Sequence, residues 1–115
     1  GVPWVHQGRN RLGVDCVGLL FVTCWSVGLL QGDDVRGYGI APDPDWMREQ
    51  CDRLLVRADA PQIGDVILMH LTKRLLHAGI RTDHGVLHSW GGRRVCEVRM
   101  GSWRIAAAYT VPGVA

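Results

Sequence analysis

Cys16 is the residue whose type and position most directly suggest covalent chemistry. It follows Asp15 at the start of a dense apolar run, in the stretch GVDCVGLLFVTCW over residues 13–25. A thiol becomes a strong nucleophile as a thiolate, and the unpaired N–H groups of a helix N-terminus lower its pKa. If Asp15 caps a helix, Cys16 lies in the first turn. The alternative is that Cys16 is simply a small core residue.

A cysteine nucleophile also needs a base, and two histidines can be brought together on a predicted hairpin. His77 and His88 fall in the short apolar segments HAGIRT and VLHSW, which the turn TDHG separates. A four-residue turn pairs Arg81 with Val86. Gly79 then faces His88 and leaves open space there, and His77 becomes the diagonal neighbour of His88. Such neighbours have Cβ atoms about 7 Å apart on one face of a sheet.

Simpler roles for these histidines stay open. His77 and His88 could be surface or hydrogen-bonded strand residues, and a one-residue slip in register would move His88 to the other face. Cys16, His77 and His88 could also bind zinc with a water molecule as the fourth ligand. A thiolate–imidazole pair accounts for the same residues without a metal, so we predict neither a metal nor a cofactor.

Two helices and a series of strands are expected to position these residues. The first helix is predicted from Asp15 to about Leu30. The second begins at Asp43 and Pro44, and the spacing of Met47 and Cys51 places both on one face. The hydrophobic pattern then shortens from helical to strand spacing, which predicts four or five antiparallel strands in a meander, in DVILMHL, HAGIRT, VLHSW, RVCEVRM and AAAYTVP. Helices followed by strands indicate the α+β class.

Length and composition limit the classes of protein to consider. The chain has 115 residues, 47% of them hydrophobic and 21% charged, with a formal net charge of +2. We therefore predict a single domain over residues 1–115. No basic run argues for nucleic acid as a partner, and no apolar run is long enough to insert into a membrane.

The four cysteines form no CxxC pair, and the chain is rich in core residues, so we favour thiols over disulfides. Cys24 and Cys51 fall on apolar helix faces and should be buried. Cys96 shares strand parity with Val98 and Met100, so it too should face apolar neighbours.

Together these motifs resemble the NlpC-type cell-wall cysteine peptidases, which have a papain-like fold. GVDCVGLL is similar to the family's D-C-S-G-hydrophobic nucleophile motif. IGDVILM is similar to its PGD entry into the first core strand, and HAGIRTDHGVLHSW to its HVGIY strand and third catalytic residue. The resemblance implies an N-terminal helix that carries the nucleophile and packs on a four- to five-stranded antiparallel sheet.

The resemblance also implies a role for each matching residue. Cys16 corresponds to the nucleophile, His77 to the general base and His88 to the residue that orients the base. Trp4 stands where the family commonly has a tyrosine that lines the site, and Asp15 matches an aspartate that shapes the substrate pocket. The implied reaction is cleavage of a peptidoglycan stem peptide between a γ-linked D-glutamate and a diamino acid.

Two positions depart from the family pattern. Trp4 lacks the tyrosine hydroxyl, although its indole N–H can donate a hydrogen bond. Val17 replaces the common serine beside the nucleophile. These departures keep open a second hypothesis: a structural component of a bacteriophage tail tip that retains the peptidase fold and no longer cuts.

The two ends of the chain resemble a narrower branch. GVPWVHQGR and SWRIAAAYTVP are similar to tail-associated peptidases of bacteriophages and gene transfer particles. This likeness implies a place in the virion tail beside other tail-tip or hub proteins, with action in the host periplasm and cell wall.

Overall fold

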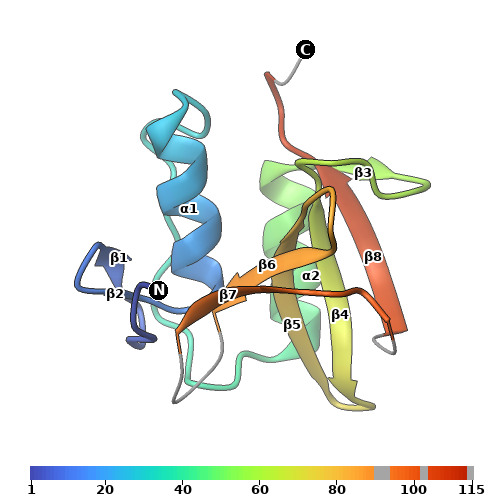
Figure 1. Ribbon diagram of the computed structural model, residues 1–115, viewed down its shortest axis with the longest axis horizontal. Helices are drawn as coiled ribbons and strands as arrows, with labels where there is room; N and C mark the ends of the chain where they lie inside the picture. The colour runs from blue at the N-terminus through green and yellow to red at the C-terminus, as the bar shows by residue number, and fades with distance from the viewer. Residues whose placement is uncertain (90–93, 102–103, 114–115) are drawn as a thin grey trace.

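A computed structural model describes residues 1–89, 94–101 and 104–113. Helices α1 and α2 pack against an antiparallel sheet, and a two-stranded ladder lies near the N-terminus (Figure 1). The α+β prediction is confirmed. In chain order the elements are β1 (Arg9–Asn10), β2 (Gly13–Val14), α1 (Cys16–Ser26), α2 (Pro44–Leu54), β3 (Val56–Ala58), β4 (Val66–Thr72), β5 (Leu75–Arg81), β6 (Val86–Ser89), β7 (Val95–Val98) and β8 (Arg104–Thr110).

The main sheet has six described strands in the order β3-β8-β4-β5-β6-β7. The predicted strands are all present, and β3 is an addition that the sequence analysis missed. This short strand pairs with β8, with Val56 opposite Thr110. The predicted meander holds from β4 to β7 but is wrong for the last strand, because β8 returns to lie between β3 and β4. Strands β6 and β7 cross toward the N-terminal end of α1 (Figure 1).

Helix α1 begins where the sequence predicts and ends earlier. Asp15 is the N-cap, and its side chain accepts a hydrogen bond from the Gly18 amide. The helix was expected to reach about Leu30, but it stops at Ser26. Gly28 has a φ of +81°, and the amide of Leu29 turns back to the carbonyl of Cys24. A left-handed residue of this kind ends a helix in spite of the apolar side chains that follow.

Helix α2 follows its sequence signals. Asp43 caps it by accepting a hydrogen bond from the Trp46 amide, and Pro44 is its first residue. Met47 and Cys51 are buried on one face of the helix, as their spacing predicts.

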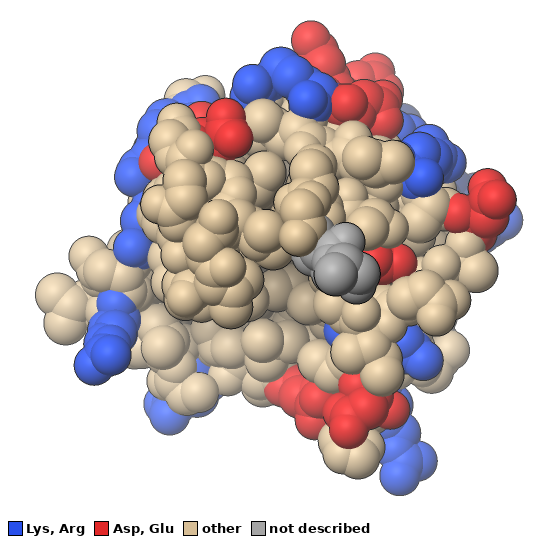
Figure 2. Space-filling view, turned by 90° about the horizontal axis from the view of Figure 1, so that it is seen from above, with Lys and Arg blue, Asp and Glu red and all other residues tan. Residues whose placement is uncertain are grey.

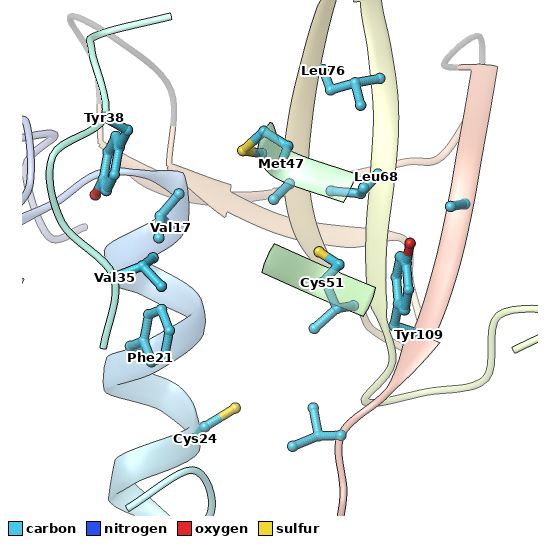
Figure 3. Close-up of a cluster of buried hydrophobic side chains, with 14 residues drawn as sticks. Val17, Phe21, Cys24, Val35, Tyr38, Met47, Cys51, Leu68, Leu76 and Tyr109 are labelled. Carbon is cyan, nitrogen blue, oxygen red and sulfur yellow. The ribbon is translucent and has the colours of Figure 1, made fainter. Parts of the chain in front are cut away.

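The main core lies between the two helices and one face of the sheet (Figure 3). Cys24 from α1 and Cys51 from α2 are buried in it, which confirms the prediction for both. A smaller apolar cluster of Ile67, Met69 and Val86 is fully buried apart from the main core. Met69 lies opposite His77 in the β4–β5 ladder, so this second cluster adjoins the histidine-bearing part of the sheet.

Charged side chains of both signs lie around the rim of the face shown in Figure 2, and its centre is largely uncharged. That face offers no extended basic patch for nucleic acid. Among the described residues, no helix combines the length and apolar character needed to cross a membrane.

Candidate active site

Cys16 occupies the first turn of α1 and contacts the strand that carries His77. Its sulfur receives a hydrogen bond from the backbone of Ala78 in β5, and the backbone groups of Cys16 and Val17 also face it. Burial of the thiol, with the nearby negative charge of Asp15, outweighs these donors and raises the pKa of Cys16 to about 11. The thiol is therefore protonated at neutral pH in the resting site.

A hollow of about 220 Å³ brings most of the sequence-predicted site residues together. Cys16 and His77 both line it, as do Trp4 and Asp15, the two predicted substrate-binding residues. His88 does not line the hollow, but it contacts His77, which does. The remaining lining residues are Tyr38, Ile40, Ala41, Pro42, Leu71, Leu75, Leu76 and Ser89. Apolar side chains therefore form much of the wall around the thiol.

His77 and His88 form a buried imidazole pair. The Nε2 atom of His77 lies 2.9 Å from Nδ1 of His88, and the two rings meet edge to face with centroids 5.0 Å apart. Strands β5 and β6 pair with Arg81 opposite Val86, so the predicted register and the diagonal contact are both confirmed. Burial and the neighbouring His88 lower the pKa of His77 to about 4, and burial lowers that of His88. Both rings are neutral at pH 7.

Gly79 allows this pairing in a different way from the one expected. The prediction was open space opposite His88, but a Cβ atom on Gly79 would lie 2.4 Å from Val86 Cγ1 and 3.0 Å from the carbonyl oxygen of Leu87. The space is therefore filled by Val86 from the adjoining strand. A glycine is needed here because the two strands approach too closely for any side chain at this position.

Cys96 is exposed, so the prediction that it faces apolar neighbours is wrong. It lies opposite His88 in the β6–β7 ladder, and its Sγ atom is 3.6 Å from Nε2 of His88. Parity within one short strand did not reveal which face of β7 is covered.

Asp15 is buried and accepts several hydrogen bonds from the protein. Oδ2 accepts from the Gln7 amide at 2.8 Å and from the Tyr38 hydroxyl at 2.7 Å. Oδ1 accepts from the Gly18 amide at 2.7 Å and from Arg9 at 3.3 Å. Asp15 therefore ties the N-terminal loop and the loop after α1 to the helix start that carries Cys16.

Sequence reasoning missed three residues that support the site. Arg9 bonds to Asp15, to Asp34 and to the hydroxyl of Tyr38, and its side chain is buried despite its charge. The Ser89 hydroxyl donates to the Val14 carbonyl at 2.7 Å. Ser89 stands beside a candidate site residue, which was a usable signal. Arg9, in the two-residue strand β1, and Tyr38, in the loop after α1, carried none, because no local pattern in the sequence pairs these two positions.

The zinc alternative gains no support from the described part of the chain. No group of three or more His, Cys, Asp or Glu side chains there is arranged to hold a metal. His77 and His88 instead point ring nitrogens directly at each other at hydrogen-bonding distance.

A cysteine at a helix start, next to a strand histidine that a second imidazole contacts, forms a candidate thiol site on an antiparallel sheet. The chain belongs to the NlpC/P60 family, which matches residues 1–107. Members of this family are generally cell-wall peptidases, which supports a peptidoglycan-cleaving cysteine peptidase. A comparison with curated protein sequences finds no significant match.

Proposed function

We propose that the chain is a cysteine endopeptidase that cleaves the stem peptide of bacterial peptidoglycan. The observation that carries this proposal is the shared hollow, in which the Cys16 thiol and the His77 imidazole face the same space. His88 contacts the far side of the His77 ring. This proximity supports the roles that we propose for Cys16 as nucleophile, His77 as base and His88 as orienting group.

The resting protonation states favour general-base activation of the thiol. The pKa of Cys16 is raised to about 11 and that of His77 is lowered to about 4, so a neutral thiol faces a neutral imidazole. Because Nε2 of His77 faces His88, the nitrogen that accepts the thiol proton is Nδ1. Proton transfer then accompanies attack of the sulfur on the amide carbon.

The helix start supplies donors for the charge that develops next. The tetrahedral oxyanion accepts hydrogen bonds from backbone N–H groups there, that of Cys16 above all. One such donor is worth about 3 kcal/mol in other enzymes. His77 returns its proton to the leaving amine, and the C–N bond breaks to leave a thioester on Cys16. Water, deprotonated by His77, then releases the acid and restores the thiol.

The lining of the hollow suggests how a peptide would bind. Trp4 is half-buried at the hollow and offers a flat apolar surface to an extended chain. We assign it, with Asp15, to the substrate pocket, Asp15 acting chiefly by holding the pocket walls together. By family resemblance, the bond cut joins a γ-linked D-glutamate to the following diamino acid.

We further propose that the protein acts as part of a phage or phage-like tail, in the host periplasm and cell wall, beside other tail proteins. The support is the likeness of both ends of the chain to tail-associated peptidases. Co-purification of the protein with intact particles tests this location, and its absence from purified tails would contradict it.

Digestion of purified peptidoglycan tests the activity and the bond together. The wild type should release fragments whose masses place the cut after the γ-linked D-glutamate, and Cys16→Ala should release none. Fragments cut elsewhere in the stem peptide would show that the assigned bond is wrong, but the proposal of peptidase activity would stand.

The second candidate is a structural tail component that no longer cuts. Trp4 and Val17, where the family pattern has other residues, favour it. Such a protein would bind peptidoglycan or tail partners equally well with and without the Cys16 sulfur and would release no peptide fragments.

A further inference from the structure

We propose that Cys96 is a positioning residue that sets the tautomer of His88 and, through it, the nitrogen on which His77 carries its proton. This inference deepens the proposed peptidase function and rests on it for its kinetic consequence. Cys96 then acts at a distance from the substrate, as the outer end of a chain of contacts that leads to Cys16.

The chain of contacts runs through two imidazoles. Sγ of Cys96 lies 3.6 Å from Nε2 of His88, and Nδ1 of His88 lies 2.9 Å from Nε2 of His77. The β6–β7 ladder places Cys96 directly opposite His88, so paired backbones hold the sulfur at the ring.

Two neutral imidazoles in contact can share their protons in only two ways. In the first, His77 donates from Nε2 to Nδ1 of His88, which leaves the Nδ1 lone pair of His77 to act as base. In the second, His88 donates from Nδ1, and His77 must then carry its own proton on Nδ1 and cannot accept another. The partner of each outer nitrogen selects between such tautomers.

Cys96 meets the outer nitrogen of His88 and therefore biases this choice. In the productive arrangement His88 carries its proton on Nε2, and the Cys96 sulfur accepts that hydrogen bond. In the unproductive arrangement the thiol donates to Nε2 instead. Sulfur is a weak acceptor and a weak donor, and a thiolate accepts only. We infer that Cys96 acts as the acceptor, since that direction delivers a basic nitrogen to Cys16.

Nitrogen NMR of labelled protein at pH 8 tests the tautomers without any substrate. In the wild type, both His77 and His88 should be protonated on Nε2. In Cys96→Val, which keeps a strand-forming side chain without an acceptor, the signals should shift toward a mixture of tautomers. A wild-type His88 protonated on Nδ1, or tautomers unchanged in Cys96→Val, would overturn the proposal. This result stands even if no peptidase activity is found, so the two proposals can fail separately.

Kinetics at pH 8 test the consequence. Cys96→Val should lower kcat about fivefold to tenfold, the size expected for one neutral hydrogen bond, and leave KM unchanged. Cys96→Asp, which supplies an acceptor and no donor, should restore kcat to the wild-type range. Glu97→Val, the same kind of change at the next exposed position of β7, should leave kcat unchanged. Two results would contradict the positioning role of Cys96. One is an equal loss of kcat in Cys96→Asp and Cys96→Val, and the other is a loss of kcat in Glu97→Val as large as that in Cys96→Val.

Discussion

The hydroxyl of Ser89 donates a 2.7 Å hydrogen bond to the carbonyl oxygen of Val14. Ser89 directly follows His88 on β6, and Val14 lies two residues before Cys16. Both residues are buried, and 75 positions of sequence separate them. This bond therefore joins the strand that carries the imidazole pair to the backbone that enters α1 at the nucleophile.

Removal of this bond should weaken both the fold and the reaction. Ser89→Ala removes the Ser89 donor from the buried Val14 carbonyl, which keeps its longer bond from the Val5 amide at 3.3 Å, so the free energy of unfolding should fall by about 0.5–1.5 kcal/mol. The start of α1 would also lose a contact that holds it against β6. We therefore expect kcat to fall by a larger factor than the one by which KM rises. Urea unfolding and the rate of amine release from peptidoglycan measure the two effects.

Ser26→Ala is the matched control for that experiment. The Ser26 hydroxyl also donates to a backbone carbonyl at 2.7 Å, that of Thr23, but at an exposed site at the other end of α1. It should change stability by less than about 0.5 kcal/mol and leave activity unchanged. Equal effects of the two substitutions would show that the Ser89–Val14 bond has no special role.

Tyr38→Phe should impair the support beneath Cys16. The Tyr38 hydroxyl donates to Asp15 at 2.7 Å and accepts from Arg9 at 2.9 Å, so its loss removes a hydrogen bond to a buried carboxylate. We expect a loss of about 2 kcal/mol in stability and a lower kcat. Tyr109→Phe also removes a bond to a carboxylate, that of Asp52, but away from the hollow. It should affect stability alone, and a matching loss of activity would contradict the assignment.

The register of the histidine hairpin depends on a glycine. Gly79→Ala would place a methyl group against Val86 Cγ1 and the Leu87 carbonyl oxygen, so the β5–β6 pair must shift. We expect a destabilisation of about 1–3 kcal/mol and a change in the His77 and His88 NMR signals. Gly39→Ala is the control, because a Cβ atom there meets nothing within 4 Å. A Gly79→Ala protein as stable as Gly39→Ala would refute this packing.

Buried His77 should make the protein less stable in acid. Burial, with a smaller effect of His88, lowers the pKa of His77 from 6.5 to about 4, so the unfolded chain binds a proton more readily. The contribution to stability is fully present above pH 6.5 and is lost as the pH falls toward 4, by roughly 3 kcal/mol. Unfolding free energies from pH 8 to pH 4 should show this slope, and His77→Gln should remove it. His84→Gln, at an exposed turn, should leave it unchanged.

The raised pKa of Cys16 changes what thiol probes should report. A preformed thiolate would be labelled preferentially in mild acid. Because burial raises the Cys16 pKa to about 11, iodoacetamide at pH 6 should label exposed Cys96 before Cys16. Mass spectrometry of tryptic peptides gives the order. Faster labelling of Cys16 would mean that the resting site holds a thiolate–imidazolium pair.

The parts of the site that sequence predicted are those fixed by local rules. A four-residue turn and strand alternation were enough to bring His77 next to His88, and an aspartate before an apolar run was enough to place Cys16 at a helix start. Both are short-range consequences of backbone geometry.

The rest depends on contacts between distant segments. Strand β3 is short and exposed, and it exists because β8 returns to pair with it. Arg9, in strand β1, meets Tyr38, in the loop after α1, only when these two segments fold together. Cys96 was placed wrongly because strand parity gives two faces, and only the tertiary fold decides which of them is covered.

The rate of amine release from purified peptidoglycan tests the central claim, that Cys16 is the nucleophile, most directly. The same conservative change can be made twice on α1, as Cys16→Ser at the hollow and Cys24→Ser in the core. The wild type should release new amino groups, Cys24→Ser should retain that activity in proportion to its folded fraction, and Cys16→Ser should release none while remaining folded. Undiminished release by Cys16→Ser, or no release by the folded wild type, would contradict the account.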